Sequence, residues 1–257
     1  MVTLEIKNLS VALGGRAVVR GVSADFASGA LTGIVGPNGA GKSTLVRAIL
    51  SLLPFDGRVL VDGAELLPRA ELARRVAYLP QGQTLHWPLT VERLVGLGRL
   101  PHLGPMSRIS DTDAAAIERA MARADVAALR DRVATELSGG ELARALLARA
   151  LAVEAPALIA DEPLASLDPG HQFDVMEMLR AEARSGGTVI AVLHDLGMAA
   201  RYCDRLLLID GGGIIADGGP ADVLTPDNLR QVYGIEATIA LDGPWPIITT
   251  LGRSIDR

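Results

Sequence analysis

A glycine-rich segment that ends in lysine and serine is the clearest place in the sequence for chemistry. Residues 36–44 read Gly-Pro-Asn-Gly-Ala-Gly-Lys-Ser-Thr, a spacing in which glycines let backbone N–H groups turn toward phosphate oxygens. In such a loop the lysine reaches the β- and γ-phosphates of a nucleotide, and the hydroxyl that follows it binds Mg²⁺. We therefore expect Lys42 and Ser43 to hold the phosphates and the metal of a nucleoside triphosphate. Lys42 is one of only two lysines among 25 basic residues, and its compact charge suits this task.

Two acidic residues follow an apolar segment further along the chain. Residues 157–160 are apolar and lead into Asp161-Glu162-Pro163, which is typical of a buried parallel strand that ends in two acids. Open α/β sheets bind their ligands at the carboxyl ends of such strands. We expect Asp161 to hold Mg²⁺ directly or through water, and Glu162 to be the general base that polarises the attacking water. Taken alone, the pair is equally compatible with an exposed turn before proline.

A third segment, Leu137-Ser138-Gly139-Gly140-Glu141, opens an apolar pattern that predicts a helix through Arg149. Its backbone N–H groups and helix dipole suit a phosphate-bearing partner. The same residues also form a capping box, with Ser138 as the cap and Glu141 three positions later, and local chemistry does not separate the two interpretations. The order of the motifs does: the glycine-rich loop, Gln81, this segment, the acidic strand and His194 follow one another as in the ABC (ATP-binding cassette) ATPases. The chain resembles that family over nearly its whole length.

The resemblance assigns further roles. It implies that Gln81 senses the γ-phosphate and the metal, that Asp168 lies in a loop crossing a dimer interface, and that His194 contacts the γ-phosphate and orients Glu162 and water. The implied catalytic residues are Glu162, His194, Gln81 and Lys42, and the implied metal ligands are Ser43, Gln81 and Asp161. The implied nucleotide contacts are Gly36, Pro37, Asn38, Gly39, Ala40, Gly41, Lys42, Ser43, Thr44, Ser138, Gly139, Gly140 and Asp168. No chemistry is assigned to His86, His102 or His171, which lack metal-ligand spacing.

One position departs from the family pattern. Relatives usually carry an aromatic residue near the amino terminus that stacks on adenine, and Leu13 stands where we would expect it. Leu13 and Val18 could still pack on the purine, but without aromatic stacking we expect modest discrimination between ATP and GTP.

These motifs require a sheet whose strand ends meet at one edge. Apolar segments at 31–35, 157–160 and 188–193 predict its strands, and a helix is expected from the glycine loop through Leu52. The resemblance implies an α/β fold, that of P-loop nucleoside triphosphatases, with an inserted helical subdomain. We expect one cassette over residues 1–257, with a nucleotide-binding lobe at 1–82 and 153–220, a helical lobe at 83–152 and a carboxyl-terminal extension at 221–257. Apolar spacing in the helical lobe predicts one helix over 114–124 and a second through Val126, Leu129 and Val133.

Composition limits the classes of function. The chain has 257 residues, 49% of them hydrophobic, and a formal net charge of −5, which gives no basic footprint for nucleic acid. Cys203 is the single cysteine, so no internal disulfide can form and a reducing cytoplasm is expected. The sequence shows no export signal and no apolar run of about 18 residues. We expect a peripheral protein on the cytoplasmic face of the cell membrane.

Two segments indicate a transported cargo. Residues 98–103 and the tail from Val232 to Ile248 resemble segments of importer ATPases for ferric siderophores, haem and cobalamin. Zinc or manganese import is the close alternative, and an ABC ATPase of DNA repair or of ribosomes is a different class that usually carries coiled coils or a second cassette. A catalytically silent subunit is disfavoured because Glu162 and His194 are both present.

The resemblance also implies partners: a second copy arranged head to tail, a membrane permease and, indirectly, a solute-binding protein. The apolar segment 84–89 is either a docking site for the permease or a loop that packs the lobes together.

Overall fold

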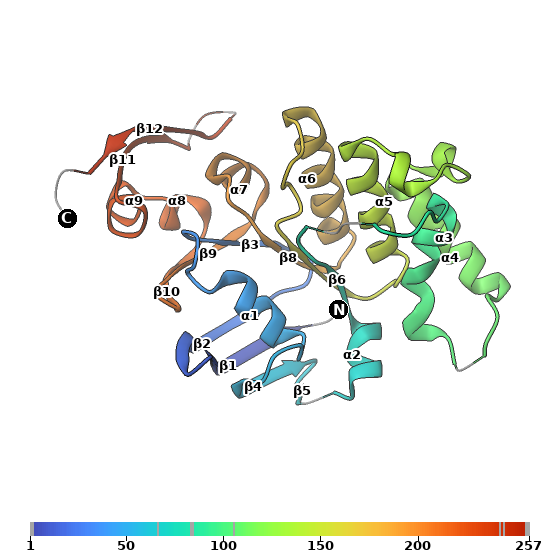
Figure 1. Cartoon of the computed structure of the whole chain (residues 1–257). Coiled ribbons are helices and arrows are strands. Elements are labelled where there is room, and N and C mark those ends of the chain that lie inside the picture. The colour runs from blue at the N-terminus through green and yellow to red at the C-terminus, as the bar shows by residue number, and fades with distance from the viewer. Residues whose placement is uncertain are drawn as a thin grey trace.

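The fold is built on a mostly parallel sheet. The computed structural model describes residues 3–65, 67–82, 85–104, 106–241, 243 and 245–254. Within these residues the larger sheet has the strand order β10-β9-β3-β8-β7-β6, in which β10 alone is antiparallel to its neighbour (Figure 1). Its strands are β3 (Leu31–Val35), β6 (Val76–Leu79), β7 (Ala157–Asp161), β8 (Thr188–Val192), β9 (Arg205–Asp210) and β10 (Gly213–Gly218).

A second, antiparallel sheet covers one face of the first, with the helix α1 (Lys42–Ile49) between them (Figure 1). Apolar side chains of α1, such as Leu45 and Ile49, pack with residues of both sheets in an inter-sheet core. The strands of this sheet are β1 (Leu4–Leu13), β2 (Arg16–Phe26), β4 (Asp56–Val61) and β5 (Ala64–Glu65).

The helix expected through Leu52 ends at Ile49. Ser51 has a φ of +54°, and the Leu52 N–H donates to the Arg47 carbonyl at 2.8 Å. This left-handed turn satisfies carbonyls that the helix would otherwise leave without partners. Leu52 consequently lies outside the core, with 53% of its surface exposed.

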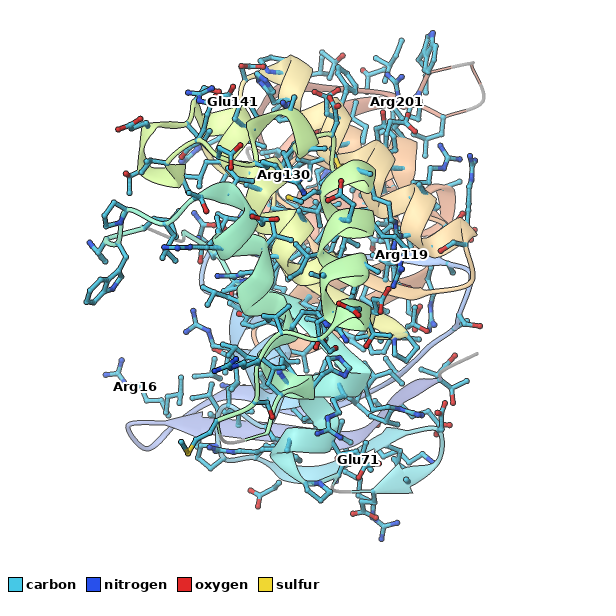
Figure 2. The ribbon with its side chains drawn as sticks, turned by 90° about the vertical axis from the view of Figure 1, so that its right-hand side faces the viewer. Arg16, Glu71, Arg119, Arg130, Glu141 and Arg201 are labelled. Atoms are coloured by element: carbon cyan, nitrogen blue, oxygen red, sulfur yellow. The ribbon has the colours of Figure 1, made fainter. Side chains whose placement is uncertain are left out.

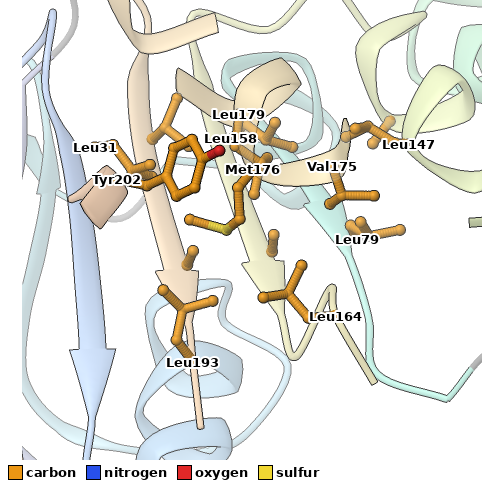
Figure 3. Close-up of a cluster of buried hydrophobic side chains, with 14 of the residues drawn as sticks. Leu31, Leu79, Leu147, Leu158, Leu164, Val175, Met176, Leu179, Leu193 and Tyr202 are labelled. Carbon is orange, nitrogen blue, oxygen red and sulfur yellow. The ribbon is translucent and has the colours of Figure 1, made fainter. Parts of the chain in front are cut away.

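Helices α6 (Pro169–Arg184) and α7 (Leu196–Tyr202) cover the other face of the parallel sheet. Figure 3 shows Met176 and Leu179 of α6 and Tyr202 of α7 gathered over Leu158 of β7. Along β7 the side chains alternate, since Leu158 belongs to this core and Ile159 to the inter-sheet core. Both faces of the strand are therefore buried, as its continuous apolar sequence predicts.

Helical elements occupy the segment between β6 and β7. The predicted helix over 114–124 is α4, in which Ile117, Ala120 and Met121 are buried while Ala114 is exposed. Figure 2 views the molecule from this side, with Arg119 on α4 and Glu141 at the start of α5. The elements are α3 (Val91–Gly96), η1 (Leu97–His102), α4 (Asp111–Arg123), η2 (Ala127–Leu129), η3 (Ala134–Glu136) and α5 (Gly139–Leu151), and α2 (Arg69–Arg75) precedes β6.

The second helix predicted through Val133 is wrong. Asp125 takes a φ of +51° directly after α4, and one 3₁₀ turn over 127–129 follows. Beyond that turn the backbone pairs with a distant segment: the Val91 N–H donates to Arg132 O at 3.0 Å, and the Ala134 N–H donates to Leu89 O at 2.8 Å. These long-range hydrogen bonds replace the helical ones that the apolar spacing predicted.

The short element η1 is joined tightly to the end of α5. A Cβ on Gly98 would lie 2.1 Å from the Arg149 carbonyl oxygen, so only glycine permits this approach. Arg99 is buried, and its guanidinium donates to Asp113 Oδ1 at 2.9 Å and to Ala152 O at 2.8 Å. His102 Nε2 lies 2.8 Å from Val153 O. The segment that resembles importer ATPases thus fastens η1 to α4 and α5.

The carboxyl-terminal part adds two short helices and a hairpin beside α7 (Figure 1). The hairpin lies in the tail that resembles those of importer ATPases, and the Arg201 guanidinium lies 4.0 Å from the centroid of the Trp245 ring. The elements are α8 (Pro220–Val223), α9 (Pro226–Tyr233), β11 (Ile235–Ala240) and β12 (Ile247–Arg253).

None of the helices described is both long and apolar enough to cross a membrane.

Candidate functional site

The glycine-rich loop connects β3 to α1 in a way that leaves the helix N-terminus open. Gly41 precedes α1 with a φ of +102°, and within the described residues no side chain caps the helix. Its first N–H groups therefore have no intrahelical partner and can bind an anion. A Cβ on Gly36 would lie 2.0 Å from Ile209 O, and one on Gly41 would lie 2.8 Å from Val18 O. The loop can pass this close to β9 and β2 only with glycine at these positions.

Lys42 is the buried cation of the loop, with 5% of its surface exposed. Its Nζ donates to the Gly36 carbonyl at 2.8 Å and to the Pro37 carbonyl at 2.9 Å. Burial lowers the pKa of the Lys42 ammonium, while the Glu162 and Asp161 carboxylates act in the opposite direction. The ammonium thus lies among loop carbonyls and beside the two acids that the sequence singled out.

Asp161 reaches α1 because it ends a strand with alternating faces. Ile159 points into the inter-sheet core, so Asp161, two residues later, faces α1 as well. The Ser43 hydroxyl donates to Asp161 Oδ1 at 2.9 Å, and the Tyr78 hydroxyl donates to Oδ2 at 3.3 Å. Burial raises the pKa of the Asp161 carboxyl, while these two hydrogen bonds lower it.

Sequence reasoning missed Tyr78, although it noted the neighbouring Gln81. Tyr78 pairs with Ile159 in the register of β6 and β7 and so lies on the same face as Asp161. A tyrosine inside an otherwise apolar strand, in a chain with three tyrosines, was the available signal, since a buried hydroxyl needs a partner.

The ends of three neighbouring strands bring Gln81, Glu162 and His194 together. Gln81 Nε2 donates to Glu162 Oε2 at 2.5 Å, and His194 Nε2 lies 2.6 Å from Glu162 Oε1. Because β6 and β8 flank β7, each oxygen of the carboxylate faces the residue from one neighbouring strand. Glu162 has a φ of +52°, a strained conformation that is frequent at functional sites and costs about 1–3 kcal/mol.

A pocket joins the glycine-rich loop to this carboxylate. The lining residues are Val18, Asn38, Gly39, Gly41, Lys42, Ser43, Thr44, Glu162 and His194. Val18 therefore lies where a nucleotide would bind, whereas Leu13 is exposed and does not line the pocket.

The segment 137–141 adopts the capping box that the sequence left open. Ser138 Oγ accepts the Glu141 N–H at 3.3 Å, and Glu141 Oε2 accepts the Ser138 N–H at 2.8 Å. The first intrahelical bond runs from Leu142 N to Ser138 O, so the N–H groups of Gly139 and Gly140 precede it and can still bind a phosphate. The capping interpretation and the phosphate interpretation are therefore compatible.

Ser138, Gly139, Gly140 and Asp168 do not line the pocket around Lys42. Asp168 instead caps α6, and its Oδ1 accepts the His171 N–H at 3.1 Å. Of the predicted site residues, the structure thus gathers Lys42, Ser43, Gln81, Asp161, Glu162 and His194. Gly139 lines a second pocket that also reaches Glu162.

The gathered residues fit a nucleoside triphosphate with Mg²⁺. Ser43 and Asp161 present oxygen atoms 2.9 Å apart, and hydroxyl and carboxylate oxygens are what Mg²⁺ prefers. The loop glycines and the uncapped N-terminus of α1 suit phosphate oxygens.

Comparisons with known proteins agree with this geometry. Residues 19–165 match the family model described as ABC transporter. The chain is 42% identical to a hemin import ATP-binding protein of Pseudomonas aeruginosa, over 92% of this chain and 94% of that protein. It is 46% identical to a hemin import ATP-binding protein of Streptomyces coelicolor, over 88% and 81% of the two chains. A cobalamin import ATP-binding protein of Halobacterium salinarum is 45% identical over 93% of this chain, which spans only 61% of that longer protein.

Solved structures show the same fold. A metal-chelate type ABC transporter in an inward-facing conformation superposes with a TM-score of 0.85 over 99% of both chains, at 22% identity. An ATP-binding cassette of an ABC transporter in its ADP conformation gives a TM-score of 0.81 at 27% identity, over 91% of this chain and 98% of that one. On its fold, on the loop that holds Lys42 and on these matches, the chain belongs to the ABC transporter family, as an ATP-binding cassette.

Proposed function

We propose that this chain is the ATP-hydrolysing subunit of an importer that takes up haem, a ferric siderophore or cobalamin through a membrane permease. The observation that carries the proposal is the Glu162 carboxylate held between Gln81 and His194 beside the loop of Lys42. This is an arrangement for activating water against a bound triphosphate. The cargo class rests on the relatives, whose names specify hemin and cobalamin import, and these favour it over zinc or manganese.

In the proposed reaction, the loop N–H groups and Lys42 bind the β- and γ-phosphates. Glu162 takes a proton from the water whose oxygen attacks the γ-phosphorus, and ADP leaves as the bond to the bridging oxygen breaks. His194 and Gln81 orient the carboxylate. Mg²⁺ held by Ser43, Asp161 and Gln81 would neutralise phosphate charge. Gln81 can contribute its Oε1, because Nε2 is the atom that donates to Glu162.

The site is completed by a second copy in this proposal. Ser138, Gly140 and Asp168 lie outside the pocket of their own chain, and a head-to-tail dimer would bring those of the partner to the γ-phosphate. The N–H groups of Gly139 and Gly140, which precede the first intrahelical bond of α5, would be available for that contact. Nucleotide would then favour the closed dimer through phosphate contacts that exist only in that state.

This chain has an apolar groove, formed by the helical elements between β6 and β7, to which a permease could bind. The groove has a volume of about 580 Å³, and its apolar lining includes Leu89, Leu97, Leu100, Leu103, Ile109 and Ile117. Trp87, in the predicted docking segment, is 76% exposed, which supports docking over the alternative of lobe packing. Thr84, the first residue of that segment, lies outside the described residues. We place the chain on the cytoplasmic face of the membrane, attached through this groove.

The predicted division of the chain suits this mechanism. Residues 1–82 and 153–220 would bind nucleotide, 83–152 would carry the permease groove and the segment 137–141, and 221–257 would form the extension. ATP turnover and permease attachment would then be served by different lobes of one cassette.

Hydrolysis is tested by measuring ATP turnover of the purified chain against its own concentration. A shared site requires turnover to rise more steeply than linearly, whereas strict proportionality from a persistent monomer would contradict the dimer. The cargo is tested in proteoliposomes that contain the cognate permease and binding protein. ATP-driven uptake of haem, ferric siderophore, cobalamin, Zn²⁺ and Mn²⁺ would be compared, and uptake of the metal ions alone would overturn the cargo assignment.

A further inference from the structure

The ring of His171 occupies the space beside Gly140. A Cβ built on Gly140 would lie 2.1 Å from Cδ2, 2.3 Å from Cγ and 2.4 Å from Nε2 of this ring. No φ in the left-handed region requires glycine at position 140, so the ring itself excludes a side chain there. The imidazole of α6 thus packs directly on the first turn of α5.

The same ring is held by Asp168. His171 Nδ1 lies 2.6 Å from Asp168 Oδ2, and Asp168 Oδ1 accepts the His171 N–H at 3.1 Å. The hydrogen bonds from His171 lower the pKa of the Asp168 carboxyl, which keeps it ionised and able to accept. One side chain therefore contacts both the segment 138–140 and the loop that ends at Asp168.

The ring is not needed to form α6. Asp168 already caps the helix through the backbone N–H of His171, and Pro169 occupies its first position. The His171 side chain is also 33% exposed, unlike the buried residues that hold α6 on the sheet, such as Met176 and Leu179. The contacts of the ring therefore fix the segment 138–140 relative to the loop that ends at Asp168, and they contribute less to the stability of α6.

We propose that His171 is a positioning residue that fixes the segment 138–140 relative to Asp168, so that both enter the dimer interface as one unit. The inference rests on the proposed function, in which both segments meet the nucleotide of the second copy. Without the ring, each would reach the partner independently, and the closed dimer would lose the benefit of pre-positioned groups.

The test uses the full chain with Glu162→Gln. In this variant ATP is bound but hardly hydrolysed, so the ATP-bound dimer would accumulate. In this parent, His171→Ala is expected to weaken ATP-dependent dimerisation by roughly tenfold, the scale of one contact pair, as measured by sedimentation. Nucleotide affinity of the dilute monomer and the Tm are expected to stay unchanged, because the pocket of Lys42 does not include His171. His171→Phe keeps a ring over Gly140 but loses Nδ1. Its ATP-dependent dimerisation is expected to be intermediate between that of the parent and that of His171→Ala.

A matched control and a double variant sharpen the result. Asp174→Asn removes another contact between α6 and α5, the 3.7 Å ion pair with Arg144, and should dimerise like the parent. Gly140→Ala should impair dimerisation strongly, and less so when combined with His171→Ala, because the added methyl group then has room.

Three outcomes overturn the inference alone, and a fourth overturns it together with the proposed dimer. Dimerisation of His171→Ala within twofold of the parent does so, as does a loss accompanied by equal falls in monomer affinity and Tm, which would indicate a merely structural role. Strictly additive effects of Gly140→Ala and His171→Ala would deny the steric contact. A Glu162→Gln parent that binds ATP but stays monomeric would refute the dimer of the proposed function itself, and the inference with it.

Discussion

Replacing Glu162 with glutamine tests the reasoning about the site most directly. The carboxylate accepts from Gln81 Nε2 at 2.5 Å and from His194 Nε2 at 2.6 Å. A glutamine of the same length offers one oxygen and one NH₂ group, so one of these donors loses its acceptor. The new NH₂ group can instead face His194, because the tautomer of His194 that carries its proton on Nδ1 accepts at Nε2, and Gln81 then keeps both its bond and its Oε1. We therefore expect the variant to fold and to bind ATP as the native chain does.

ATP turnover, in contrast, is expected to fall in this variant, because an amide cannot take the proton of the attacking water. Loss of a general base lowers the rate by roughly 10²- to 10⁴-fold, which corresponds to about 3–5 kcal/mol of transition-state stabilisation. Single-turnover hydrolysis of radiolabelled ATP measures this step apart from product release. Glu162→Asp is the matched control: it keeps a carboxylate but shortens its reach, and we expect an intermediate rate. Native turnover in Glu162→Gln would refute the assignment of the base.

Three further outcomes follow from contacts elsewhere in the chain. In denaturant titrations, Arg99→Ala should lower the free energy of unfolding by about 1–3 kcal/mol, because a buried carbonyl loses its donor. Arg119→Ala, whose side chain is 58% exposed, should lower it by only about 0–1 kcal/mol. Equal losses would contradict the structural role of the buried Arg99. Tyr78→Phe should raise the Mg²⁺ concentration for half-maximal turnover by about tenfold, which is the lower end of the effects seen for groups that orient metal ligands. An unchanged concentration would show that the hydrogen bond from Tyr78 to Asp161 does not contribute to Mg²⁺ binding. Burial raises the pKa of the Cys203 thiol to about 12, so hardly any thiolate is present at pH 8. Iodoacetamide should therefore leave the folded chain unmodified at pH 8 and label it in denaturant.

The local motifs of the site were predictable because each is written in consecutive residues. The loop of Lys42 and the pair Asp161-Glu162 follow apolar strands, and strand ends in a parallel sheet meet at one edge. The hydroxyl of Tyr78 in an apolar strand indicated that it has a partner, but the identity of that partner depends on the register of β6 with β7. The contact of His171 with Gly140 depends likewise on the packing of α6 against α5. A single residue carries no periodic signal for such a neighbour.

The errors in secondary structure have a related cause. Val126, Leu129 and Val133 have helical spacing, yet backbone hydrogen bonds with residues 89–92 take up that segment. The end of α1 was placed at Leu52 by its apolar character, whereas Ser51 terminates the helix through a left-handed turn. Apolar periodicity reports burial, and it does not report which backbone groups find distant partners.

Helix α5 runs as a single rod between the segment 138–140 at its amino end and η1 at its carboxyl end. Arg99 and His102 hold η1 to residues 152–153 at the carboxyl end of the rod, while Leu97, Leu100 and Leu103 of the same segment line the groove. The 13 residues of α5 span about 20 Å at 1.5 Å per residue. A tilt of about 10° imposed at the groove would then displace Gly139 and Gly140 by roughly 3 Å over that length, about the length of a hydrogen bond. In the proposed dimer, a small load on η1 would therefore be enough to make or break phosphate contacts at the opposite end.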